Sequence, residues 1–145
     1  NPMLLNLEAI ILIQEGKIIE ATKLYKKGLS SFPSHRAFVY GLAEHYIRSS
    51  NTTVAIDLLN DYLLTYPEDP NLYELMSKAQ AKEGKVLLQH ENLAEAFYYR
   101  YNIKEAITLL DLAVRAKDGN FYEKSRVESR LKELQKELEL FRKGL

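Results

Sequence analysis

Apolar and small residues recur along this chain with the spacing of amphipathic helices, and the pattern occurs in two copies. The second copy follows the first at an interval of 34 residues, from Ala9 to Ala43. The two copies are Ala9, Gly16, Ala21, Tyr25, Leu29 and Pro33, then Ala43, Ser50, Ala55, Leu59, Leu63 and Pro67. Small residues at fixed offsets mark places where two helices cross closely, and a repeat of this length is typical of stacked helical hairpins. The pattern therefore predicts an all-α, right-handed solenoid of helical hairpins.

Glycine and proline divide the repeats into helices. Gly16 is expected to end the first helix, because glycine readily takes the left-handed conformation found at helix ends, and Pro33 blocks continuation of the second. The predicted helices are residues 3–14, 18–31, 36–47, 52–64 and 71–82. This arrangement resembles the tetratricopeptide repeat (TPR), an array that binds other proteins more often than it carries out chemistry.

The strict interval fails in the third repeat. Gln89 stands where a third alanine is due, and Ala106 restores the pattern 17 residues later. Half a repeat is therefore re-used, and helix 86–101 is predicted to serve as the second helix of one hairpin and the first of the next. We predict a single TPR domain, 1–145. Its hairpins are 3–31, 36–64, 71–101 and 86–116.

A narrow apolar stripe runs through the last predicted helix, residues 121–142. Its members are Val127, Leu131, Leu134, Leu138 and Phe141. The end of a solenoid needs a unit that covers the last hydrophobic face and presents polar groups to water, so this helix is interpreted as a capping helix. A second hypothesis is that the stripe is a coiled-coil seam, through which a scaffold unit associates with its own copy.

Charge and composition limit the classes of partner and of site that this chain can be expected to have. Twenty basic and twenty acidic residues leave a formal net charge of zero, which does not favour nucleic-acid binding. The absence of cysteine excludes disulfides and thiolate metal sites. The apolar segment 4–13 is about half the ~20 residues that a membrane span needs, so membrane insertion is not expected. Because the chain begins with Asn1-Pro2, we interpret it as a piece of a longer protein.

No residue pattern predicts catalysis or a metal site in this chain. His90-Glu91 begins like a zinc-peptidase helix, but Ala94 stands where the second histidine is needed. Asp57 and Asp61 lie one helical turn apart, yet no nucleophile or partner base is indicated near them. We assign no catalytic, cofactor or metal-binding residue.

The C-terminal third resembles a particular protein family. The segments that carry the resemblance are Ala94-Glu95-Ala96-Phe97-Tyr98-Tyr99, Ile103-Lys104-Glu105-Ala106-Ile107, Leu112-Ala113, Gly119-Asn120-Phe121-Tyr122 and Ser125-Arg126-Val127-Glu128-Ser129-Arg130-Leu131. They are similar to the C-terminal TPR region of bacterial envelope metallopeptidases of the beta-barrel assembly-enhancing protease family, in which a zinc peptidase domain with an HExxH helix precedes the repeats. The HExxH motif does not occur in this sequence.

The resemblance implies a periplasmic, non-catalytic domain that docks the parent zinc metallopeptidase on outer-membrane barrel assembly machinery and on barrel substrates. It also implies contact with the protein's own peptidase domain, where zinc is expected. If the resemblance fails, the alternative is a generic TPR adaptor or scaffold unit in the cytoplasm.

The geometry of TPR arrays predicts which side chains face a protein-binding groove, because the first helix of each hairpin lines the concave surface. We predict these groove residues: Tyr40, Glu44, Arg48, Asn71, Glu74, Lys78, Lys82, Glu91, Glu95, Tyr98 and Tyr99. Tyrosine and arginine suit peptide recognition, because each supplies contact area together with a polar group for the peptide backbone.

Overall fold

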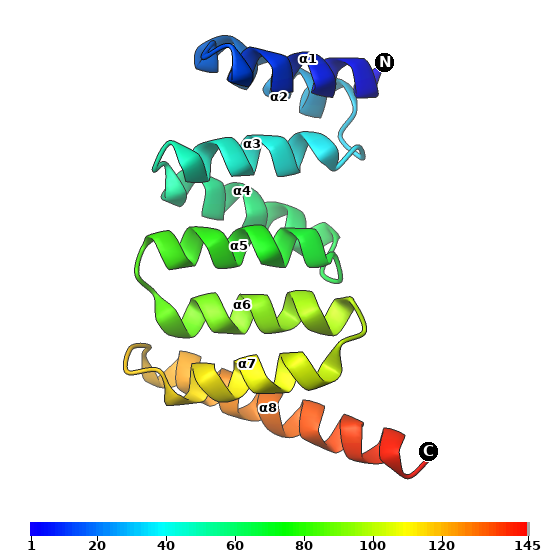
Figure 1. The fold of residues 1–145 in the computed structure, drawn as a ribbon, viewed down its shortest axis with the longest axis vertical. Helices are drawn as coiled ribbons and strands as arrows, with labels where there is room; N and C mark the ends of the chain where they lie inside the picture. Colours follow the sequence, from blue (N-terminus) through cyan, green and yellow to red (C-terminus); the bar gives the residue numbers. More distant parts are fainter. Residues whose placement is uncertain (145) are drawn as a thin grey trace. The chain divides into compact units, whose positions relative to one another are not determined.

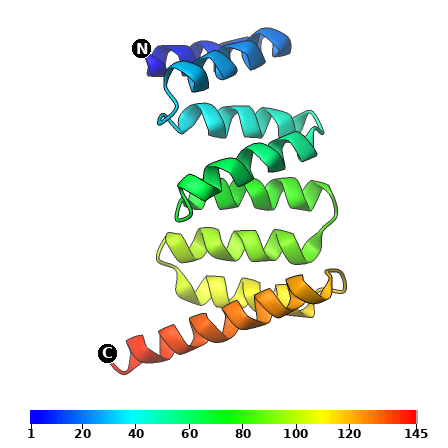
Figure 2. The same ribbon diagram turned by 180° about the vertical axis from the view of Figure 1, so that it is seen from behind.

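The computed structural model describes residues 1–144, and the regular elements within this range are all α-helices (Figures 1 and 2). The helices are α1 (Pro2–Gln14), α2 (Ile18–Ser31), α3 (Ala37–Arg48), α4 (Thr52–Thr65), α5 (Pro70–Lys82), α6 (Val86–Tyr99), α7 (Ile103–Arg115) and α8 (Phe121–Arg142). No strand occurs among the described residues. The predicted all-α fold of TPR-like hairpins is confirmed.

Left-handed residues form the tight turns inside the hairpins, as the glycine pattern indicates. Gly16 and Gly84 have φ angles of 77° and 73°, and Ser50 takes the corresponding place in the second repeat with a φ of 63°. A side chain in this region is strained, which explains why glycine stands at two of these turns. The same conformation recurs at Tyr101, with a φ of 65°.

Helix α6 ends two residues before the predicted limit of 101. Arg100 caps the helix, and Tyr101 leaves the helical region of backbone conformation, so the chain turns before Ile103 begins α7. Asn102 accepts a hydrogen bond from the backbone amide of Glu105 and is the N-cap of α7. The other helices begin and end within one residue of their predicted limits.

The chain folds as two compact units, Asn1–Asp61 and Tyr62–Leu145, with the boundary inside α4. We call them unit 1 and unit 2 and describe each by itself. The predicted organisation as a single domain stays a prediction.

Unit 1 has a core of small and aromatic residues. Ala9, Tyr25, Phe38 and Leu42 form one buried cluster that joins α1, α2 and α3. Phe38 lies against Gly28, at a position where any added Cβ would overlap its ring. The ring therefore requires a residue without a side chain on the facing helix.

Unit 2 places α6 between two neighbours. Helix α6 packs against α5 and against α7, and α8 packs against α7 and α6. Figures 1 and 2 show α5, α6 and α7 side by side, with α8 running obliquely across α7. The core of this unit includes Leu87, Leu110, Val127 and Leu134, all fully buried.

Helix α8 covers the core of unit 2, as predicted for a capping helix. Val127 and Leu134 are buried, and Leu131 packs against the same cluster. The first part of the apolar stripe is therefore occupied within unit 2, whereas its last member, Phe141, is exposed near the end of the helix. Among residues 1–144 no helix is both long enough and apolar enough to span a membrane.

Candidate protein-binding surface

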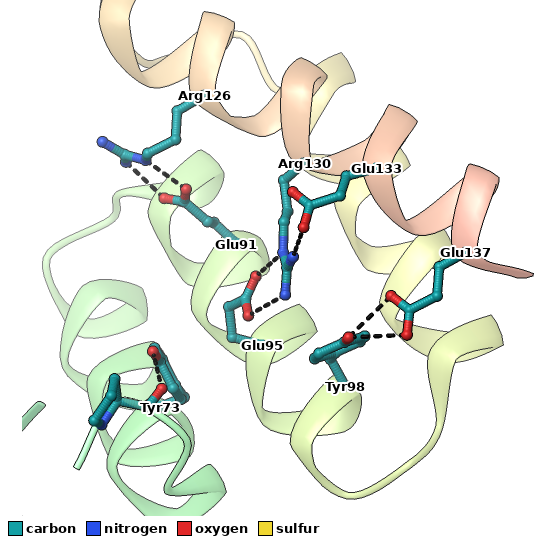
Figure 3. A network of polar contacts seen from close by, with 9 residues as sticks. Tyr73, Glu91, Glu95, Tyr98, Arg126, Arg130, Glu133 and Glu137 are labelled. Atoms are coloured by element: carbon teal, nitrogen blue, oxygen red, sulfur yellow. Dashed lines mark hydrogen bonds and ion pairs between the residues drawn. The ribbon is translucent and has the colours of Figure 1, made fainter.

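A row of polar side chains joins α6 to α8, and we call it the polar ladder (Figure 3). It consists of Glu91, Glu95 and Tyr98 on α6, paired in order with Arg126, Arg130 and Glu137 on α8. Glu91 and Glu95 lie one turn apart, as do Arg126 and Arg130, so side chains at this spacing share one face of each helix. The ladder therefore fixes the register of α8 on α6.

Two arginines form the central contacts of the ladder. Arg126 donates from Nε and Nη2 to the two carboxylate oxygens of Glu91, at 2.6 and 2.7 Å. Arg130 donates in the same way to Glu95, at 2.7 and 3.0 Å, and its Nη1 donates to Glu133 at 2.8 Å. Bidentate pairs of this kind are directional and strong among charged hydrogen bonds, so they orient both helices.

The Arg130–Glu95 pair is the more buried of the two. The side chain of Arg130 is 20% exposed and that of Glu95 15% exposed. Burial opposes the charge on Arg130, but the hydrogen bonds and negative charge of Glu95, together with Glu133, raise its pKa. The guanidinium also lies 4.6 Å from the centroid of the Tyr98 ring, which is cation–π distance.

A group of tyrosines lies beside the ladder. The Tyr98 hydroxyl donates to the Glu137 carboxylate, whose oxygens are 2.9 and 3.0 Å away. Tyr99 meets the Tyr98 ring edge-on at 5.1 Å between centroids, and Tyr73 of α5 stacks on Tyr99 at 5.7 Å. Burial raises the pKa of both Tyr98 and Tyr99. These contacts hold the rings in fixed positions.

Tyr73 is anchored at its hydroxyl as well as through its ring. The hydroxyl donates to the backbone carbonyl of Pro67 at 2.6 Å. Burial, followed by the nearby Tyr99 and Glu95, raises the pKa of Tyr73 to about 12. The phenol therefore stays neutral and keeps its hydrogen bond throughout the physiological pH range.

The other predicted groove residues of unit 2 lie on α5. Arg100 donates to Asn71 at 3.0 Å and to Glu74 at 2.8 Å, and so ties the end of α6 to the start of α5. Lys78 and Lys82 are exposed on the same helix.

The predicted groove residues of unit 1 lie on α3. They are Tyr40, Glu44 and Arg48, and Arg48 forms an ion pair with Glu44 at 3.3 Å. The structure thus brings the predicted residues together in subsets within each unit, and their contact with a partner stays a prediction.

The partners of these side chains were not predicted from the sequence. Arg126 and Arg130 entered only through the family resemblance, and Tyr73 and Glu137 were not singled out. One signal was present: Glu91 and Glu95 have the same four-residue spacing as Arg126 and Arg130, at an offset of 35 residues, close to the repeat length. Equivalent helices of successive repeats were therefore candidates for charge pairing.

The His90-Glu91 segment does not fit a zinc site. Both residues lie on α6, and Ala94, where a second histidine would be needed, is fully buried. Glu91 is engaged by Arg126. Within residues 1–144 no group of three or more histidine, aspartate or glutamate side chains is placed to hold a metal ion.

Comparison with known proteins identifies the repeats. The tetratricopeptide repeat family matches residues 12–79. The match runs from the end of α1 into α5 and agrees with the helical hairpins of the structure. Repeats of this kind form extended concave surfaces that bind other proteins.

A curated relative supports the resemblance found in the C-terminal third. The chain is 34% identical over 103 residues to the "Beta-barrel assembly-enhancing protease" of Yersinia pestis, and the match covers 70% of this chain. This confirms the predicted similarity to that family. The match spans only about a fifth of the relative, 21% of its length.

Two solved structures share the fold. The chain is similar to "MamA 41-end from Desulfovibrio magneticus RS-1", with a TM-score of 0.59 and 20% identity over 94% of this chain and 77% of that one. It is equally similar to the "MamA RS-1 ArsTM double mutant", with the same TM-score and identity over 95% of this chain and 77% of that one. At this level of identity the likeness concerns the fold alone.

Proposed function

We propose that this chain is the non-catalytic docking domain of a periplasmic zinc metallopeptidase. In this proposal it holds components of the outer-membrane barrel assembly machinery, and barrel substrates, close to the peptidase domain. The observation that carries the proposal is the 34% identity to a relative named as a beta-barrel assembly-enhancing protease. The tetratricopeptide repeats support it, because such repeats bind proteins and peptides.

The proposed mechanism is a gain in local concentration. A docking domain that binds a partner even weakly keeps it near an active site carried by the same polypeptide. Linkage of two binding events in this way raises apparent affinity by ~100-fold or more. The domain would thereby select substrates without contributing to the cleavage step.

The test measures binding of purified barrel assembly machinery to this chain and to the double variant Tyr99→Ala/Glu44→Lys. Because tyrosine is enriched among the residues that carry most of the binding energy of an interface, we expect capture to weaken by about tenfold or more. The double variant changes one predicted groove residue in each unit.

A matched control for this experiment is Tyr122→Ala/Glu128→Lys, which makes the same changes at exposed positions of α8 outside the predicted groove. Circular dichroism must show both double variants folded. Equal capture by the wild-type chain and by the groove variant would contradict the proposed function.

A further inference from the structure

A hollow of about 540 Å³ opens in unit 2 beside the polar ladder. We call it the tyrosine hollow. It is lined by Glu68, Tyr98, Tyr99, Tyr101, Ile103, Glu137 and Phe141. These residues come from the turn before α5, from the end of α6 and start of α7, and from the last turns of α8.

The walls of the hollow are aromatic and held in place. Tyr98 is fixed by Glu137, and Tyr99 is backed by the Tyr73 ring. The rim is exposed to solvent: Tyr101 is 97% exposed and Phe141 68% exposed. Several aromatic rings gathered around one concavity indicate a binding site, because contiguous exposed apolar surface with a polar rim often marks a place where a partner binds.

The charge around the hollow is negative. Glu68 and Glu137 line it, and Glu95 and Glu133 lie close enough to influence Tyr99 electrostatically. Arg130 is the cation among these groups, and it is already engaged by Glu95 and Glu133. An anionic ligand would therefore be repelled. A purely apolar ligand would remove water from the Glu68 and Glu137 carboxylates without replacing the hydrogen bonds that this water donates.

We propose that the tyrosine hollow binds an arginine side chain of a partner peptide. Tyrosine faces attract a cation, and a guanidinium is planar and weakly hydrated, so it stacks on a ring while donating hydrogen bonds to a carboxylate. Glu137 and Glu68 supply the carboxylates, and the rings supply the stacking surface. The inference rests on the proposed protein-binding function and names the chemistry that the partner must present.

The first experiment titrates the chain, labelled with ¹³C in its tyrosine rings, with short capped glycine–serine peptides that differ at one central residue. That residue is arginine, norleucine or glutamate. We expect the arginine peptide to shift the ring signals of Tyr98, Tyr99 and Tyr101, and to bind about five- to tenfold more tightly than the norleucine peptide. Raising the salt concentration to about 0.5 M should reduce that preference, because screening weakens partly exposed charge interactions.

The second experiment removes the charge of the hollow. The double variant Glu68→Gln/Glu137→Gln should lose most of the preference for arginine, a fall of about fivefold or more in affinity for that peptide. The matched control is Glu128→Gln, which removes one carboxylate from an exposed position of α8 outside the hollow. It should bind the arginine peptide within about twofold of wild type.

The outcomes separate this inference from the proposed function. Equal affinity for the arginine and norleucine peptides, or ring shifts confined to tyrosines outside the hollow, would overturn the inference. The proposed function would then still be decided separately, by the experiment that measures capture of the barrel assembly machinery. Conversely, binding of the arginine peptide in the hollow, combined with no capture of the machinery, would support the inference and contradict the identity of the proposed partner.

Discussion

Units 1 and 2 are both built of helical hairpins, but they join their helices in different ways. In unit 1, aromatic rings fill spaces left by glycine: Phe38 lies against Gly28, and Tyr25 lies against Gly41. In unit 2, the polar ladder ties α6 to α8 through charged pairs such as Arg130–Glu95. The small residues at the helix crossings are buried in both units; Ala9 and Ala106 are examples.

The difference shows that small residues mark the helix crossings in both units, while the contacts that join the helices around them differ in kind. Apolar packing in unit 1 should respond to changes in side-chain volume and be insensitive to salt. The ladder of unit 2 should respond to charge. Four substitutions test this contrast, in order of decreasing expected loss of stability.

Phe38→Ala should destabilise unit 1 most strongly. The side chain is fully buried, and removal of a buried phenylalanine costs about 3–5 kcal/mol of unfolding free energy. Urea unfolding measures the total loss, and amide hydrogen exchange shows whether it falls on residues 1–61. Phe121→Ala is the matched control: that ring is 78% exposed, so the change should stay within about 0.5 kcal/mol. A loss of unfolding free energy below about 1 kcal/mol for Phe38→Ala would contradict the view that this ring fills the space beside Gly28 and stabilises unit 1.

Arg130→Met should destabilise unit 2 by about 2 kcal/mol, because it leaves the half-enclosed Glu95 carboxylate without its cation. The double variant Arg130→Met/Glu95→Gln should recover part of the loss, and a double-mutant cycle isolates the coupling between the two side chains. Additive effects would mean that the pair does not hold α8 on α6.

Asp118→Ala should cost about 1 kcal/mol. The Asp118 carboxylate accepts hydrogen bonds from the backbone amides of Val86 and Leu87, at 2.8 and 3.0 Å, and so caps α6 from the loop before α8. The control Asp111→Ala removes only the exposed ion pair with Arg115, for which about 0.3–0.5 kcal/mol is expected. If both substitutions cost the same, the cap contributes little to the stability of unit 2.

Tyr73 should add a small pH dependence at the alkaline end. Its folded pKa of about 12 lies above the ordinary value of 10.0, so the stability it contributes is complete below pH 10 and is lost as the pH rises toward 12. The ring is partly exposed to solvent, and we therefore expect about 1 kcal/mol or less. Unfolding at pH 8 and pH 11 should show a smaller decline for Tyr73→Phe than for the wild-type chain. If Tyr73→Phe loses as much stability between pH 8 and pH 11 as the wild-type chain, the pH dependence comes from other groups.

Helix positions could be predicted from the sequence because their determinants are local. Gly16 and Gly84 take left-handed turns, and Pro70 begins α5 at a position where its missing amide costs nothing. Alanines at fixed offsets marked the crossings. The end of α6 was predicted two residues late, because nothing in the sequence before Asn102 shows that Tyr101 adopts a positive φ.

The candidate site was predictable only in part. Periodicity placed Glu91, Glu95, Tyr98 and Tyr99 on one helix face, but it contained no information on what faces them. The ladder depends on the distance and rotation between α6 and α8, which follow from packing of residues such as Val127 and Leu134. The tyrosine hollow likewise depends on chain segments that are far apart in the sequence.

The position of α6 between α5 and α7 has a consequence for how such arrays change in length. If every helix packed against only one fixed partner, the array could gain or lose helices only as complete hairpins. Here α6 packs against both the helix before it and the helix after it. Insertion or deletion of a single helix at this point would thus still leave each helix a neighbour to pack against, and it would exchange the first and second places of the helices that follow.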